Sequence, residues 1–219
     1  MQDWIEVTGM VIKGLPIGEY DKRITILTRE RGKISAFAKG ARRPNSRLMA
    51  ATSPFSFGVF KLFEGKNSYN IMDVSIDNFF EGLREDFEAA YYGMYFLEIA
   101  DFYTRENNDD KEMLRLLYQS VRALQVKSIP NMLVQSVYEI KSLAVNGEFP
   151  GIKDAAKWDS DTLYTVEYIV NSPIEKLYTF AVSDPVLLQL MELSSWYREK
   201  YIGTGFKSLE ILENCRLKN

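Results

Sequence analysis

The chain has 219 residues and a mass of 25.3 kDa, enough for one large domain or two small ones. Apolar residues make up 46% and charged residues 26%, which is typical of a globular protein and excludes collagen, low-complexity disorder and a disulfide scaffold. The net charge of −3 excludes a globally basic nucleic-acid binder. The absence of histidine excludes His-based triads and Cys/His zinc sites, and Cys215 has no second cysteine to pair with.

Neither the chain start nor any apolar run predicts a membrane segment. The longest strongly apolar stretch, residues 87–103, is interrupted by acids, and its uncharged centre is far shorter than the roughly 20 residues that a membrane span needs. The first residues include acids and have no apolar core of the kind found in secretory signals. We therefore expect a soluble, cytoplasmic protein that is not bound to a membrane.

The first 80 residues have the alternation and turn signals of short β-strands. The expected strands are residues 4–13, 23–28, 33–39, 54–63 and 69–76. The segment from Gly14 to Gly18 is interpreted as a breaker, and Phe55, Phe57 and Val59 alternate in a way that predicts a core-facing row. Five short strands with regular turns predict a small closed barrel.

From Leu83 onward the apolar residues recur with a helical period. The expected helices are residues 86–104, 113–126, 132–145, 162–171, 173–180 and 184–201. The first is apolar on nearly every side, which is typical of a helix buried in a bundle. The sequence thus predicts a barrel domain over residues 1–80 and a helical domain over residues 81–219.

Positive charge is concentrated in the strand-rich part. From Lys22 to Arg47 the sequence holds nine Lys and Arg residues and one acid, Glu30. Cations on strands and in the polar loop after residue 39 can follow a phosphate backbone, and the planar guanidinium of Arg can bind phosphate oxygens through two donors. The pattern is consistent with a nucleic-acid-binding face, and a solvated strand face is the alternative that the residues leave open.

Four aromatic residues near this basic window can in principle stack on bases, namely Phe37, Phe60, Phe63 and Tyr69. Strand aromatics more often belong to the core, so a core position is the favoured interpretation for each. No catalytic motif accompanies them: the phosphate-binding loop and the dinucleotide fingerprint are both absent. We expect no enzyme activity, no catalytic residue, no metal and no cofactor.

Four segments, in their order along the chain, resemble a known family. They are residues 8–28, residues 32–48, the aromatic helix after the barrel, and residues 171–180 together with 207–212. The closest match is Gly-Lys-Ile-Ser-Ala-Phe-Ala-Lys-Gly-Ala-Arg-Arg-Pro-Asn-Ser-Arg-Leu at residues 32–48. Over nearly its whole length the chain resembles the bacterial recombination mediator RecO family of DNA repair proteins.

The resemblance implies an α+β fold, with an N-terminal five-stranded OB-fold barrel followed by an all-helical domain. It implies binding of single- and double-stranded DNA, annealing of complementary strands and assistance in recombinase loading, with RecR and single-strand-binding protein as partners. The DNA-contacting positions that it carries over are Lys33, Lys39, Arg42, Arg43 and Arg47, together with Lys22 and Arg23.

The chain departs from the family at one place. Many members carry four zinc-binding cysteines between two helical stretches, whereas residues 149–163 contain none. We therefore expect no zinc there and a loop held by packing of Phe149 and Trp158. Two other functions are considered: a protein-interaction module without DNA binding, and a small-molecule enzyme that would need two partner-free acids facing one cavity.

Overall fold

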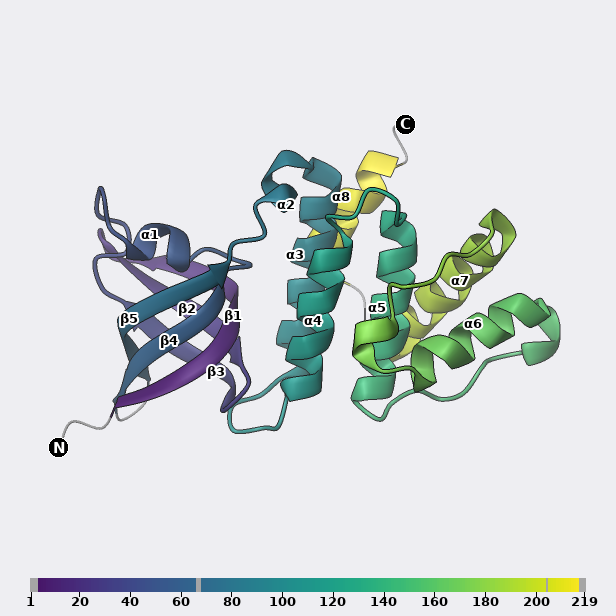
Figure 1. Cartoon of the computed structure of the whole chain (residues 1–219), viewed down its shortest axis with the longest axis horizontal. Helices are drawn as coiled ribbons and strands as arrows, with labels where there is room; N and C mark the ends of the chain where they lie inside the picture. The colour runs from purple at the N-terminus through teal and green to yellow at the C-terminus, as the bar shows by residue number, and fades with distance from the viewer. Residues whose placement is uncertain (1–3, 66–67, 204, 217–219) are drawn as a thin grey trace. The chain divides into compact units, whose positions relative to one another are not determined.

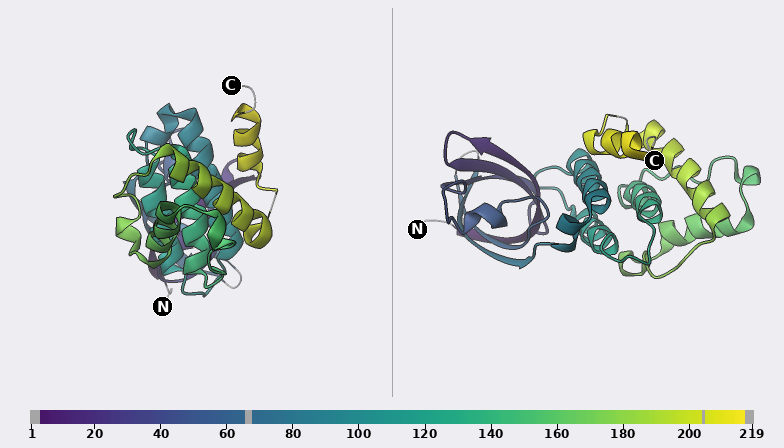
Figure 2. Two further views of the ribbon diagram at one scale, coloured as in Figure 1. Left: turned by 90° about the vertical axis from the view of Figure 1, so that its right-hand side faces the viewer. Right: turned by 90° about the horizontal axis from the view of Figure 1, so that it is seen from above.

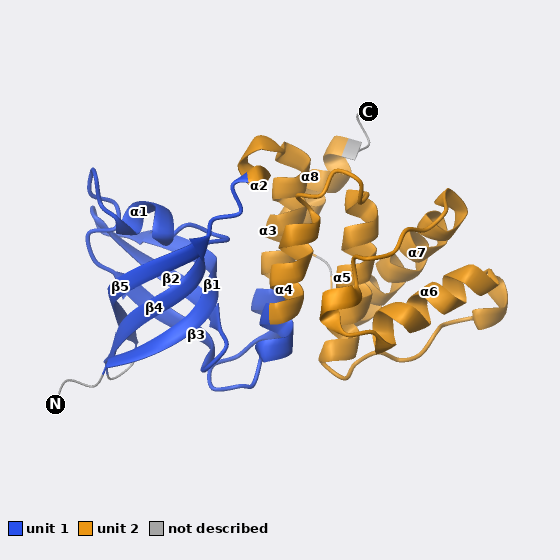
Figure 3. Ribbon diagram, viewed as in Figure 1, with its two compact units in different colours: residues 1–81, 100–114 blue, residues 82–99, 115–219 orange. Residues whose placement is uncertain are grey.

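A computed structural model describes residues 4–65, 68–203 and 205–216. The chain forms two compact units, coloured separately in Figure 3. The first comprises residues 1–81 and 100–114, and the second residues 82–99 and 115–219. The predicted domain boundary after residue 80 assigns residues 100–114 to the helical domain. In the structure this segment belongs to the same unit as the barrel, to which its backbone is hydrogen-bonded.

The first unit contains a five-stranded barrel (Figure 1). Its strands are β1 (Trp4–Ile17), β2 (Asp21–Thr28), β3 (Gly32–Ala38), β4 (Phe57–Glu64) and β5 (Tyr69–Asn78). They close in the order β1-β2-β3-β5-β4, with β4 pairing back to β1 and only the β3–β5 pair parallel. The right-hand view of Figure 2 shows the rolled sheet. The predicted fold class, an OB-fold barrel followed by helices, is confirmed.

Alternation along each strand fills the barrel with apolar side chains. On β3 the residues Ile34, Ala36 and Ala38 are buried, while the residues between them are half-buried on the outer face. Ile24 and Ile26 of β2 join the same core. The interior is therefore built from the period-2 pattern that predicted the strands, and the intervening positions are left for the outer surface.

Strand β1 extends through the segment that we interpreted as a breaker. It pairs with β2 as far as Ile17, opposite Asp21, and its register shifts between Val11 and Lys13. Strand β4 accompanies β1 only as far as Met10, so the outer part of β1, which still pairs with β2, is an edge of the sheet. Pro16 is tolerated there because an edge position needs no hydrogen bond on its open side.

The core-facing row predicted for β4, namely Phe55, Phe57 and Val59, was wrong by one residue. Gly58, Phe60 and Leu62 are buried, whereas Phe57 and Val59 are only half-buried. Both faces of this strand carry large apolar side chains, so alternation alone does not identify the inner one. At the buried position 58 only glycine fits, because a Cβ atom there would lie 2.1 Å from the carbonyl oxygen of Ser75 on β5.

The second unit is helical. The longer helices that contribute to it, wholly or in part, are α3 (Phe87–Tyr103), α4 (Lys111–Ala123), α5 (Asn131–Val145), α6 (Ser160–Asn171), α7 (Asp184–Tyr197) and α8 (Lys207–Arg216). Helix α5 is buried from Leu133 to Leu143 and packs against α6 and α7. The short helix α2 (Gly82–Glu85) also belongs to this unit, whereas the short helix α1 (Leu48–Ala51) precedes β4 in the first unit.

One predicted helix is absent and another is shorter. Over residues 173–180 the structure has only a 3₁₀ turn at Ile174–Lys176, in which Leu177 bonds back to Ile174 three residues earlier. The spacing of these two buried apolar residues suits such a turn as well as an α-helix. Helix α7 gives way to a π-helical turn at Arg198–Ile202.

The loop without cysteines is held by aromatic packing, as expected. The indole Nε1 of Trp158 donates to the carbonyl oxygen of Lys153 at 2.7 Å, and the ring of Phe149 lies 5.4 Å from that of Tyr197. The Tyr197 hydroxyl donates to the carbonyl oxygen of Gly151. Within the described residues no group of three or more Cys, Asp or Glu is placed to hold a metal ion, and no helix has the length and apolarity to cross a membrane.

Candidate nucleic-acid interface

Five of the seven predicted contact residues gather around the turn between β1 and β2. We call this set the hairpin patch, and its members are Lys22, Arg23, Lys39, Arg42 and Arg43. The loop that follows β3 is docked on that turn: the backbone N–H of Arg42 donates to the carbonyl oxygen of Tyr20 at 2.8 Å, and its Nη1 donates to that of Gly18 at 3.1 Å. The arginines of the loop are thereby held beside the strand cations.

Two further contacts fix the docked loop. The Arg43 guanidinium lies 5.4 Å from the centre of the Tyr20 ring, a cation–π arrangement. Gly40, with φ +69°, makes a bend that sequence reasoning did not identify, and its N–H donates to the Asp21 carboxylate at 2.7 Å. That bond occupies one carboxylate oxygen of Asp21, the acid that precedes Lys22 in the chain.

The strand members of the hairpin patch are set by the β2–β3 register. Lys22 lies opposite Ala38, the residue before Lys39, so Lys22 and Lys39 belong to the same end of the β2–β3 pair. The pKa of Lys22 is lowered first by burial and second by the positive charge of Arg42. Arg23 lies opposite Phe37, donates from Nε to Ser35 Oγ at 2.7 Å, and places its guanidinium 5.9 Å from the Phe37 ring.

The other two predicted residues have carboxylate partners. The Lys33 ammonium donates to Asp101 Oδ1 at 2.8 Å and to the backbone oxygen of the same residue at 2.6 Å, and its side chain is only 21% exposed. Arg47 is exposed and forms an ion pair with Asp73 of β5 at 3.0 Å. In contrast, within the described residues none of the hairpin-patch cations forms an ion pair. Whether each of the seven contacts DNA stays a prediction.

A groove extends from the hairpin patch along the outer face of β1, β2 and β3. We call it the strand groove. It has a volume of about 340 Å³ and is lined by Lys13, Leu15, Arg23, Thr25, Lys33, Ile34, Ser35, Asp101, Arg105 and Glu106. Sequence reasoning missed Lys13 and Leu15, because treating residues 14–18 as a breaker concealed their pairing with β2. Nothing local in the sequence brings Arg105 to this face.

Two family models match the chain. The model of the recombination protein O N terminus matches residues 1–80, and that of the recombination protein O C terminus matches residues 84–154 and 152–210. The chain belongs to the recombination protein O (RecO) family. The resemblance that we inferred from the sequence is therefore confirmed.

Several curated RecO proteins are similar to this chain. The DNA repair protein RecO of Acetivibrio thermocellus is 28% identical over 96% of this chain and 97% of its own length. That of Alkaliphilus metalliredigens is 32% identical over 67% of this chain and 59% of its own. That of Bacillus subtilis is 31% identical over 65% of this chain and 55% of its own.

The aromatic residues near the patch of this RecO family member divide into core and surface. Phe60 is fully buried and Tyr69 almost so, and burial raises the pKa of the Tyr69 hydroxyl. Both are core residues, as the favoured interpretation predicted. Phe37 is half-buried beneath Arg23 on the outer face, and Phe63 is also half-buried. Of the four, Phe37 is therefore the ring that lies beside the patch.

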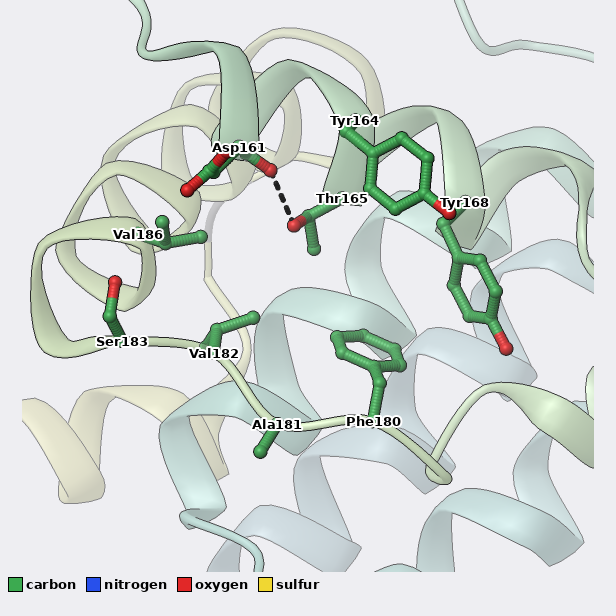
Figure 4. A pocket seen from close by; sticks show the side chains of 9 residues that line it. All are labelled: Asp161, Tyr164, Thr165, Tyr168, Phe180, Ala181, Val182, Ser183 and Val186. Atoms are coloured by element: carbon green, nitrogen blue, oxygen red, sulfur yellow. Dashed lines mark hydrogen bonds between the residues drawn. The ribbon is translucent and has the colours of Figure 1, made fainter.

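The helical unit carries a groove of about 410 Å³, shown in Figure 4. One wall is a face of α6 with Asp161, Tyr164 and Tyr168, and the other is the extended segment around Phe180. Tyr164 is 69% exposed, so most of its side chain is accessible to solvent (Figure 4). Asp161 is the single carboxylate among the lining residues.

A second groove of this unit, of about 280 Å³, has two acids in its lining. Both have cationic partners: Glu192 is paired with Lys157, and Glu213 lies 3.6 Å from Arg198. The described residues that line these two grooves thus include no pair of partner-free acids, which is the arrangement that the small-molecule enzyme alternative requires.

Proposed function

We propose that this RecO family member is a non-enzymatic, cytoplasmic DNA-binding protein of DNA repair, and that it holds DNA through the hairpin patch. The observation that carries the proposal is the gathering of five cations on one turn, none of them ion-paired to a described carboxylate. Positive groups that are not neutralised can replace the counterions of a polynucleotide, which is the main source of sequence-independent affinity.

The position of the patch supports the proposal. OB-fold barrels bind oligonucleotides on the face of the second and third strands and with adjoining loops. Lys22 and Arg23 belong to β2, and Arg42 and Arg43 to the loop after β3. The patch binds phosphates and reads no base sequence, so it accepts both single- and double-stranded DNA.

Strand annealing follows from the same electrostatics. Two complementary strands repel each other through their phosphates, and a shared cationic surface lowers that repulsion. In this proposal the helical unit provides the surface for RecR and for single-strand-binding protein, and the assembly assists recombinase loading. The exposed aromatic groove of α6 supports the protein-binding role, since aromatic residues are enriched at protein interfaces.

The salt dependence of binding tests the proposal. With about five phosphate contacts, the logarithm of the binding constant for a fluorescent single-stranded oligonucleotide should fall with the logarithm of salt concentration with a slope of about −3.5. Changing Arg42→Glu with Arg43→Glu should abolish most of the binding. The matched control, Arg84→Glu with Lys127→Glu, changes the same amount of charge at exposed positions of the helical unit and should bind normally.

Absence of binding at low salt, or a response that does not depend on salt, would contradict the proposal. In that case the alternative of a protein-interaction module without DNA binding gains support. A calorimetric titration with RecR serves as the control, because the Arg42 and Arg43 double variant should bind RecR as tightly as the unchanged protein under either function. The DNA-binding measurement therefore separates the two functions.

A further inference from the structure

The strand groove combines positive, polar and apolar side chains on one face of the barrel. The register places Leu15 opposite Arg23, which in turn lies opposite Phe37. Two residues further along each strand, Lys13 lies opposite Thr25, which lies opposite Ser35. Alternate strand residues point to the same side of a sheet, so these two rows form one continuous outer surface.

A chain segment from the end of α3 to the start of α4 forms the wall of the groove. The backbone N–H of Lys33 donates to the carbonyl oxygen of Arg105 at 3.0 Å, and that of Asn107 donates to Arg31 at 3.0 Å. Gly32 has φ +63°, and a Cβ atom there would lie 2.4 Å from the Arg105 carbonyl oxygen. The wall therefore packs on the barrel as closely as a glycine permits.

The positively charged side chains of the groove differ in whether they are free to contact a ligand. Lys33 is paired with Asp101, and the Nη1 of Arg105 donates to the carbonyl oxygens of Phe102 and Thr104, so both serve to hold the wall. Lys13 is exposed, and within the described residues its ammonium has no hydrogen-bond or ion-pair partner. Arg23 uses only Nε for Ser35. Lys13 and Arg23 thus carry the positive charge that the groove offers to a ligand.

The groove also offers surfaces for a base. Leu15 is 51% exposed, so it offers an apolar surface next to Arg23, its partner on β2. The Arg23 guanidinium lies over the half-buried Phe37 ring. Guanidinium planes and aromatic rings are the groups on which unstacked bases rest in single-stranded recognition.

The dimensions of the groove distinguish single strands from duplexes. A volume of about 340 Å³ lies near the lower end of the roughly 300–1,000 Å³ of sites that hold one small molecule. A nucleotide of a single strand can enter such a walled groove, whereas a nucleotide of a duplex must first be unstacked and unpaired at a cost of a few kcal/mol.

We propose that the strand groove is a subsite for one nucleotide of single-stranded DNA, and that it gives this protein a preference for single strands over duplexes. Lys13 and Arg23 hold the phosphates at its edges, and Leu15 with the Arg23–Phe37 pair packs against the base. This inference rests on the proposed DNA-binding function, and it assigns to the groove a discrimination that the hairpin patch does not make.

Two groove residues outside the hairpin patch test the subsite. Lys13→Met with Leu15→Ser should weaken binding of a fluorescent single-stranded 20-mer at least tenfold, while binding of the duplex of the same sequence changes less than twofold. The salt slope for the single strand should become about 0.7 shallower, the value for one lost contact. The control pair Arg42→Met and Arg43→Met should weaken both ligands to a similar degree.

A second variant fills the groove without changing its charge. Thr25→Leu should weaken single-strand binding at least fivefold and leave duplex binding unchanged, with circular dichroism used to verify that the variant is folded. If these groove variants weaken both ligands equally, or neither, the subsite is refuted while DNA binding by the patch stands. If the unchanged protein binds neither ligand, the proposed function fails and the subsite fails with it.

Discussion

The ammonium of Lys33 and the carboxylate of Asp101 lie 2.8 Å apart although 68 residues separate them in the chain. Lys33 also donates to the backbone oxygen of Asp101 in the last turn of α3, where the carbonyl ends of the helix favour a cation. A residue that the sequence assigns to DNA contact thus fastens a helix end to the barrel.

This pairing predicts an unusual response to substitution. Asp101→Asn removes the competing carboxylate while keeping the wall in place through the backbone contact, so single-stranded DNA should bind about two- to threefold more tightly. The salt slope should steepen by up to about 0.7, the value for one added phosphate contact. Fluorescence anisotropy across a salt series measures both quantities.

The control for this prediction is Lys33 itself. In the otherwise unchanged protein, Lys33→Met should alter affinity for the oligonucleotide less than twofold, because the ammonium is already occupied. In the Asp101→Asn background the same change should cancel the gain. A large loss on Lys33→Met alone would mean that phosphate displaces Asp101 in the complex, contrary to the prediction.

Gly32 should be intolerant of any side chain. Its φ of +63° is strained for other residues, at a cost of about 1–3 kcal/mol, and a Cβ would also collide with the Arg105 carbonyl oxygen. Gly32→Ala should therefore lower the urea midpoint clearly more than Gly18→Ala, which has a similar φ of +55° and open space around it. Equal midpoints for the two variants would show that the wall does not press on Gly32.

The helical unit contains a buried ionic cluster whose disruption should be costly. Oε1 of the fully buried Glu139 accepts from Tyr95 at 2.7 Å, from Gln135 at 2.9 Å and from Arg198 at 3.2 Å. Burial is the largest single effect and lowers the pKa of the Arg198 guanidinium, but Glu139, Tyr95 and Glu213 together raise this pKa above its ordinary value. Arg198 therefore stays charged within the core.

Removing one partner leaves the other charge buried and uncompensated. Arg198→Met should lower the free energy of unfolding by about 3–5 kcal/mol, as measured by urea denaturation. Arg198→Met combined with Glu139→Met should recover much of that loss, since a buried ion pair and an apolar replacement are often close in stability. A double variant no more stable than the single one would refute this account.

Alkaline pH should destabilise the protein through the fully buried Tyr95 and the half-buried Tyr178. Burial raises the pKa of Tyr178, and burial followed by the Glu139 carboxylate raises that of Tyr95. Unfolded tyrosine titrates near pH 10, so above that pH the unfolded state releases protons that the folded state retains. Stability is complete below about pH 10 and falls above it by up to about 1.4 kcal/mol per pH unit for each such tyrosine.

The variant Tyr178→Phe isolates one contribution. Between pH 10 and 11 its unfolding free energy should fall less steeply with pH than that of the unchanged protein. The difference in slope should correspond to the release of about one proton fewer on unfolding. Tyr164→Phe is the matched control, because Tyr164 is exposed and should leave the slope unaltered. Identical slopes for all three proteins would contradict the assignment.

Patterns in the sequence identified much of the fold because those patterns are local. The period-2 alternation of residues 23–28 and 33–39 and the helical period of residues 87–103 depend on neighbouring residues, and they correspond to β2, β3 and α3. The β4 face was assigned wrongly because large apolar residues occur on both of its sides, so alternation alone does not identify the side that packs in the barrel core.

By itself, the sequence determined the family, the barrel followed by helices, and the concentration of cations between Lys22 and Arg47. Only the tertiary structure decided which of those cations are available. Asp101 and Asp73 reach Lys33 and Arg47 from distant parts of the chain, while the hairpin patch receives no such partner among the described residues. Ion pairing depends on distance in space, and the folded path of the chain, rather than the spacing of charges along it, sets that distance.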